Sequence, residues 1–283
     1  MTTPLIYFGA STTHVLRQLQ RCPEDWTYVR RNVAGWYINN FALRAAGDDA
    51  PSLIARMGDR FNSVSCYYET DFLSSSEEED MRNLLNLRKR WMIDYIAINR
   101  LSYATLEAFA SRRAAIHSIV PNCPILLMVA PWKVAGDFRN PSFAQNATLH
   151  ERLLRCQGTA TDGPLPLWAE SFPYGRNFMR ERLDREPGGS VTTVLYPRSL
   201  NPNFKTSIML APNEFAGESF LSAVQDCVYT HTEANAIPDM WVITHYGPDR
   251  FHNLPTLPET YDNLASATTL TGAAHWLLKH YGG

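Results

Sequence analysis

Residues 93–130, IDYIAINRLSYATLEAFASRRAAIHSIVPNCPILLMVA, hold the pattern that decides the fold. A mostly apolar run over 93–99 is followed by an amphipathic segment over 102–119 and by a nearly all-apolar run over 125–130. The two runs have the length of strands, and the segment between them has the length of a helix and ends before Pro121. Continuous apolar strands around a helix are typical of a parallel sheet covered on both faces. This stretch therefore predicts a strand–helix–strand unit.

The same alternation of strands and helices extends along the rest of the chain. The expected strands, including the two above, cover residues 5–9, 28–38, 63–69, 93–99, 125–130, 165–169, 207–211 and 240–244. The expected helices cover residues 13–21, 42–57, 77–90, 102–119, 140–157, 178–185, 215–229 and 270–281, and residues 191–196 form an extra strand.

Eight strand–helix units in 283 residues predict an α/β protein with a (β/α)8 TIM-type barrel, a fold that typically takes about 250 residues. We expect a single domain over 1–283, with 171–205 as an insertion between strands six and seven. The alternative is an open doubly wound sheet. Against that alternative, no glycine-rich nucleotide-binding loop follows the first strand.

Composition narrows the classes of partner. Apolar residues make up 45% of the chain, charged residues 19%, and the net charge is −2, which is typical of a globular protein and lacks the basic surplus of nucleic-acid binders. No segment approaches the roughly 18 apolar residues of a membrane span, and the first residues do not resemble a secretory signal. The five cysteines include no CxxC pair, which argues against a zinc ribbon. We therefore expect a cytoplasmic protein with no nucleic-acid or membrane partner.

The third expected strand ends in two acidic residues, Glu69 and Asp71. Side chains alternate along a strand, so both carboxylates belong to one face. Their repulsion raises the pKa of one of them, and an acid held protonated in this way can protonate a departing oxygen. The alternative interpretation is a solvated strand end at which Asp71 caps the following loop.

The seventh expected strand leads into Asn213 and Glu214. Here the sequence resembles the (β/α)8 glycoside hydrolase superfamily, in which an acidic residue after strand seven is often the nucleophile. That resemblance implies Glu214 as the nucleophile and leaves Glu69 as the general acid, with Asp71 tuning Glu69 or taking the second role. The Asn-Glu pair that many members carry after strand four is missing here, because Asn99 is followed by Arg100. Alternatively, Glu214 caps the next helix.

Aromatic and polar residues at several strand ends suit a small polar ligand, since flat rings bind sugar faces and amides bind hydroxyl groups. The expected substrate-binding residues are Trp36, Asn39, Asn99, Arg100, Trp132, Glu170, Asn213, His245 and Tyr246. The alternative is that the tryptophans fill the layer between barrel and helices and that His245 is structural.

These residues predict an enzyme that hydrolyses a glycosidic bond in a small-molecule or oligosaccharide substrate, using two carboxyl groups and no cofactor. A metal-dependent barrel lyase or isomerase is an alternative, with the strand-end acids holding Mg²⁺ or Mn²⁺. A polysaccharide lyase that acts on a uronic acid through His245 or Tyr246 is another. A non-catalytic sugar-binding barrel is the third alternative.

Overall fold

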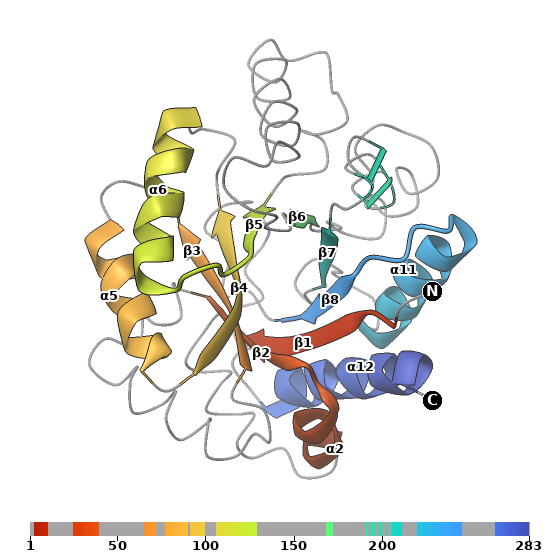
Figure 1. The fold of residues 1–283 in the computed structure, drawn as a ribbon. Coiled ribbons are helices and arrows are strands. Elements are labelled where there is room, and N and C mark those ends of the chain that lie inside the picture. Colours follow the sequence, from red (N-terminus) through yellow and green to blue (C-terminus); the bar gives the residue numbers. More distant parts are fainter. Residues whose placement is uncertain are drawn as a thin grey trace, which may run out of the picture.

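The computed structural model of the chain is a closed barrel of eight parallel strands, ordered β1 to β8 around the barrel (Figure 1). The residues that the structure describes are 3–10, 25–39, 65–71, 77–89, 91–99, 106–128, 168–171, 191, 194–195, 198–199, 202, 205–210, 220–244 and 264–282. The barrel closes because β1 pairs in parallel with both β2 and β8. The predicted fold class is confirmed.

The strands lie close to the expected positions. They are β1 (Leu5–Ala10), β2 (Gly35–Asn39), β3 (Ser65–Asp71), β4 (Met92–Asn99), β5 (Ile125–Met128), β6 (Trp168–Ser171), β7 (Lys205–Leu210) and β8 (Met240–Ile243).

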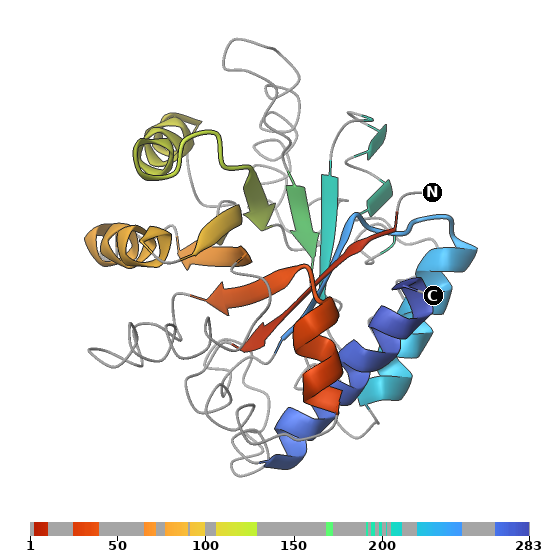
Figure 2. The same cartoon turned by 60° about the horizontal axis from the view of Figure 1, so that its bottom comes forward.

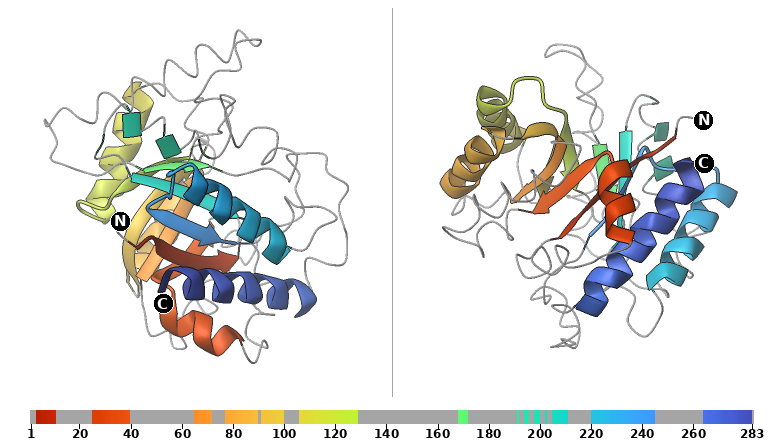
Figure 3. Two further views of the ribbon diagram at one scale, coloured as in Figure 1. Left: turned by 90° about the vertical axis from the view of Figure 1, so that its right-hand side faces the viewer. Right: turned by 90° about the horizontal axis from the view of Figure 1, so that it is seen from below.

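The described helices pack on the outside of the barrel. They are α2 (Asp25–Asn32), α5 (Glu77–Arg88), α6 (Leu106–Ile119), α11 (Phe220–Glu233) and α12 (Leu264–Gly282). Helix α12 packs against α2 and α11 and covers β1 and β8, while α5 packs against α6 and covers β3 and β4 (Figures 2 and 3). None of the helices in this part of the chain is long and apolar enough to cross a membrane.

One predicted strand, 28–38, begins too early, and another, 191–196, is wrong. Residues 28–32 belong to α2, and β2 begins only at Gly35. Val29 is buried in this helix, and Arg31 is exposed in its last turn, where a basic side chain opposes the negative end of the helix dipole. In the expected extra strand over 191–196, the described residues Val191, Val194 and Leu195 are helical. The expected helices over 13–21, 42–57, 140–157 and 178–185 lie outside the described residues.

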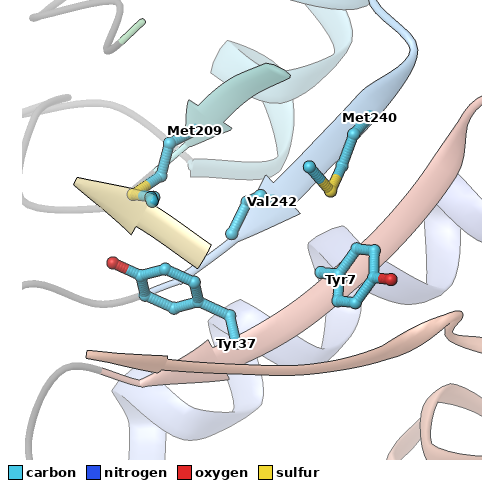
Figure 4. Close-up of a cluster of buried hydrophobic side chains, with 6 residues drawn as sticks. Tyr7, Tyr37, Met209, Met240 and Val242 are labelled. Atoms are coloured by element: carbon cyan, nitrogen blue, oxygen red, sulfur yellow. The ribbon is translucent and has the colours of Figure 1, made fainter. Parts of the chain in front are cut away.

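The inside of the barrel is an apolar core with two tyrosines. We call the face of the sheet that carries this core the inner face. The core residues are Tyr7, Tyr37, Ala97, Met209, Met240 and Val242 (Figure 4). Their sequence neighbours Phe8, Trp36 and Trp241 are also buried, and alternation places them on the opposite face, towards the helices. Burial of each large side chain contributes roughly 1.5–3 kcal/mol.

Gly9 allows β1 and β2 to approach each other closely inside the barrel. Gly9 pairs with Tyr37 in the strand register. A Cβ atom at this position would collide with the backbone oxygen of Tyr37. Only glycine therefore fits at position 9 without a shift of the backbone.

At the amino-terminal end of the barrel, a side-chain hydrogen bond joins β1 to β4. The Tyr7 hydroxyl donates to Asp94 Oδ2 at 2.8 Å, and the Tyr95 ring meets the Tyr7 ring edge to face at 5.9 Å between centroids. Burial, with the nearby charge of Asp94, raises the pKa of Tyr95. Tyr95 therefore stays neutral, and the two rings fill the amino-terminal end of the barrel.

An ion pair network lies at the same end, between β7 and β8. The Asp239 carboxylate accepts hydrogen bonds from Arg198 at 2.8 Å, from Lys205 at 3.2 Å and from the Thr206 backbone N–H at 3.0 Å. Burial opposes ionisation, but the hydrogen bonds from Arg198 and Thr206, with the charges of Arg198 and Lys205, outweigh it and lower the pKa of Asp239. The carboxylate therefore stays charged and joins the starts of both strands.

Candidate active site

Polar residues of three neighbouring strands come together at the carboxyl-terminal end of the barrel, which we call the mouth. In the strand register, Asn39 of β2 pairs with Glu69 of β3, and Asp71 of β3 pairs with Asn99 of β4. Paired positions on adjacent strands lie about 4.8 Å apart. Asn39, Glu69, Asp71 and Asn99 are thus one contiguous group, which we call the polar set.

The register also assigns the polar set to the inner face. Tyr37 and Ala97 belong to the inner core, Asn39 follows Tyr37 by two residues, and Glu69 pairs with Ala97. Because faces alternate along a strand, Asn39 and Glu69 share the inner face, and so does Asp71. All four were predicted from the sequence as site residues, and their chemical roles remain predictions.

Glu170 lies on β6, which is separated from β3 by β4 and β5. It pairs with Met128 on one side and with Ser207 on the other. Ser207 is two residues from Met209 of the inner core, so Glu170 also has an inner-face position. The inner face therefore carries acidic residues on two strands, β3 and β6.

Trp36 does not belong to the mouth. Its side chain is 1% exposed, and its ring packs edge to face against Phe8 with centroids 5.6 Å apart. It precedes the inner residue Tyr37 and therefore faces the helices. This placement contradicts the prediction of Trp36 as a substrate-binding residue and agrees with the alternative in which tryptophans fill this layer.

The remaining predicted site residues lie outside the described part of the chain, and their roles stay predictions. They are Arg100, Trp132, Asn213, Glu214, His245 and Tyr246.

Two buried residues close to the mouth were not predicted, Tyr37 and Thr244. The Tyr37 and Tyr7 hydroxyl groups point in opposite directions, and that of Tyr7 is bound at the amino-terminal end (Figure 4). Alternation from Asn39 along the strand would have selected Tyr37 in place of Trp36. Thr244 directly follows β8 and is fully buried, and its backbone N–H donates to the Leu210 oxygen at 3.0 Å. No sequence signal marks this residue.

Groups with strongly shifted pKa values lie away from the mouth. Burial lowers the pKa of His231, near the end of α11, to about 4, and its Nδ1 lies 2.8 Å from the Ala236 oxygen. Burial, with the charge of Asp94, raises the pKa of Cys123, just before β5, to about 12. Both groups are neutral near pH 7 and suit structural roles. Within the described ranges, no three side chains of the metal-binding types gather.

Comparison with known proteins supports the architecture. No family model and no curated protein matches the chain. A putative orotidine-monophosphate decarboxylase from Toxoplasma gondii is 10% identical with a TM-score of 0.50, covering 98% of this chain and 93% of its own. An OMP decarboxylase from Leishmania donovani is 7% identical with a TM-score of 0.50, covering 98% and 95%.

The Leishmania donovani UMP synthase is a longer protein. It is 8% identical with a TM-score of 0.49 over 98% of this chain, and the chain spans about half of its length, 54%. At these identities the likeness concerns the fold alone. The chain has the barrel architecture of these structures.

Proposed function

We propose that this protein is a carbohydrate-active enzyme that hydrolyses a glycosidic bond at the mouth of the barrel, with Glu69 as the general acid. The observation that carries the proposal is the strand register, which joins two carboxylic acids and two amides of three neighbouring strands into the polar set. The mouth is the end at which barrel enzymes place their catalytic residues.

The acid pair supplies the proton. Glu69 and Asp71 are two residues apart on β3, so their Cα atoms are separated by roughly 6.6 Å along one face. Two carboxylates at this spacing repel each other, which favours a shared state with one of them protonated. In that state Glu69 donates its proton to the leaving oxygen, and Asp71 remains charged.

A second carboxylate attacks the sugar carbon or activates water. Glu214 is the first candidate, because the superfamily resemblance implies a nucleophile after strand seven. Glu170 is the second, because its register position on β6 lies on the inner face across the barrel from β3. A carboxyl separation of about 5–5.5 Å would give retention at the sugar carbon, and about 6.5–9.5 Å would give inversion.

The two amides orient the substrate. Asn39 and Asn99 flank the acid pair on the strands to either side. An amide offers both donors and an acceptor, which matches the hydroxyl groups of a sugar. Substrate held on both sides of Glu69 is aligned for proton transfer.

Decarboxylation of an orotidine-type nucleotide is the second candidate, and the shared fold over 98% of the chain favours it. Loss of carbon dioxide leaves negative charge on a carbon atom, and a cation or a strong donor must stabilise it. Arg100, directly after β4 in the sequence, is the candidate cation. We rank this candidate second, because the acids and amides of the polar set match a glycosidic bond and its hydroxyl groups more directly.

A panel of p-nitrophenyl glycosides, with orotidine monophosphate as a parallel substrate, tests the proposal. We expect the wild type to release p-nitrophenol from at least one glycoside. Glu69→Gln should reduce the rate by a factor of roughly 10² to 10⁴, the usual contribution of a general acid. Glu78→Gln is the matched control, because Glu78 is exposed on α5. Turnover of orotidine monophosphate alone, or full activity of Glu69→Gln, would contradict the proposal.

A further inference from the structure

The Thr244 hydroxyl is buried without a partner among the residues that the structure describes. Thr244 is 0% exposed, and its Oγ1 atom makes no hydrogen bond there. Other threonines use their hydroxyls: Thr230 donates to the Asp226 oxygen at 2.8 Å, and Thr232 donates to the Val228 oxygen at 2.8 Å. An unsatisfied buried hydroxyl costs roughly 1–3 kcal/mol, so a ligand that restores the bond is the simplest reason to keep it.

The hydroxyl belongs to the inner face at the mouth. Thr244 follows Val242 of the inner core by two residues, and its backbone N–H continues the hydrogen-bond ladder from β8 to Leu210 of β7. Alternation along this extended segment therefore directs Thr244 to the same side as Val242. Its place at the strand end puts it above the apolar core.

The β1 residue beside this hydroxyl is a glycine. Phe8 of β1 pairs with Ile243, so Gly9 is the β1 residue next to Thr244. Gly9 contributes no side chain, and on its other side it pairs with Tyr37 of β2, two residues before Asn39. The inner face between Thr244 and the polar set is therefore free of a β1 side chain at this height.

We propose that the Thr244 hydroxyl is a substrate-binding group that forms a hydrogen bond with one hydroxyl of the bound sugar, on the side of β1 opposite the polar set. A threonine hydroxyl both donates and accepts, which suits a sugar hydroxyl. This inference rests on the proposed function, because it takes a sugar as the ligand of the mouth. It adds a residue directly after β8 that helps to determine which sugar binds.

The first test measures the free protein. Thr244→Val removes the hydroxyl and keeps the shape, so the melting temperature should stay the same or rise. Thr206→Val is the matched control, because Thr206 is also 0% exposed but its hydroxyl lies 3.4 Å from Asp239 Oδ2. We expect this control to lower the melting temperature by roughly 2–4 °C. An equal fall in Thr244→Val would overturn the inference, because it would show that the hydroxyl has a structural partner.

The second test uses calorimetry to measure the affinity of the protein for methyl glycosides of glucose, galactose, mannose and xylose. We expect one of them to bind the wild type, Thr244→Ser to bind it nearly as well, and Thr244→Val to bind it at least tenfold more weakly. One monodeoxy analogue of that glycoside should bind the wild type and Thr244→Val equally. Equal affinity of the wild type and Thr244→Val for the complete glycoside would overturn the inference.

The two proposals fail in different ways. If a methyl glycoside binds in a Thr244-dependent manner and no glycoside is hydrolysed, the hydrolase proposal fails and the binding role of Thr244 stands. If glycosides are hydrolysed and Thr244→Val leaves KM unchanged, the role of Thr244 fails alone. If none of the four methyl glycosides binds, the role of Thr244 in sugar binding is overturned as well.

Discussion

The two ends of the barrel differ in the polar residues that the strands bring together there. At the amino-terminal end, Asp94 accepts from Tyr7, and Asp239 accepts from Arg198 and Lys205. At the mouth, acids and amides of neighbouring strands are gathered by register, and Thr244 has a buried hydroxyl without a partner in the described structure. The bonds at the amino-terminal end stabilise the fold, whereas the carboxyl-terminal mouth is the end at which barrels of this type bind their ligands.

The comparison explains why strongly shifted groups need not mark a catalytic site. Among the described residues, His231 and Cys123 have large pKa changes, and burial is the main cause of both. Neither residue lies at the mouth. Barrels of this type take their catalytic residues from the carboxyl-terminal strand ends, so these two shifts indicate buried structural groups.

The largest expected effect concerns the mouth. Glu69→Gln should reduce kcat/KM by a factor of roughly 10² to 10⁴ and leave the free energy of unfolding unchanged or higher, because it removes one of two like charges. Steady-state kinetics and urea unfolding of the same preparation check this. A fall in stability that parallels the loss of activity would assign Glu69 to the fold and remove the contrast between the two ends.

The next effect concerns His231 on α11 and the loss of folding stability at low pH. The pKa of His231 is about 4 in the folded protein and about 6.5 when unfolded, so protons bind the unfolded chain more strongly between these values. Stability is therefore complete above pH 6.5 and decreases towards pH 4, by roughly 3 kcal/mol in total. Urea unfolding at several pH values measures the slope, and His231→Gln should flatten it. An unchanged slope in that variant would assign the acid sensitivity to other groups.

A smaller effect is expected at the ion pair network. Asp239→Asn should destabilise the protein by about 2 kcal/mol, since it weakens charge-assisted hydrogen bonds that are partly exposed to solvent. Because the pKa of Asp239 is lowered, the contribution of the carboxylate is present above its ordinary pKa and is lost as the pH falls through the lowered value. The variant should keep the wild-type kcat. A large loss of kcat without loss of stability would mean that the amino-terminal end also serves catalysis.

The smallest effect is expected for Tyr7→Phe, which removes one hydrogen bond and keeps the ring. The loss of the 2.8 Å bond to Asp94 should cost about 1 kcal/mol, measured as a lower melting temperature. Kinetics should not change. If the variant were as stable as the wild type, the bond would not contribute to the stability of the fold.

Much of the fold follows from local patterns in the sequence. The stretch 93–130 predicts a strand, a helix and a strand, and the structure has β4, α6 and β5 there. The first part of the strand predicted over 28–38 is wrong, because Tyr28, Val29 and Val33 favour a strand by composition, whereas packing of α2 against α12 favours a helix. The tertiary contact decides this segment.

The candidate site was predictable only in part. Alternation alone groups Glu69 with Asp71, because both lie on one strand. The pairing of Asn39 with Glu69 depends on the register between β2 and β3, and no residue pattern fixes that register in advance. The sequence also could not predict the unsatisfied hydroxyl of Thr244, because whether a buried hydroxyl finds a partner depends on how the strands pack around it.

The most direct test of the central claim is the distance between the Glu69 carboxyl and the nearer of the Glu214 and Glu170 carboxyls, measured in a crystal structure with a methyl glycoside bound. The account predicts a separation between about 5 and 9.5 Å, with the sugar between the two groups. Carboxyl groups on different sides of the barrel wall, or a sugar bound away from Glu69, would contradict it.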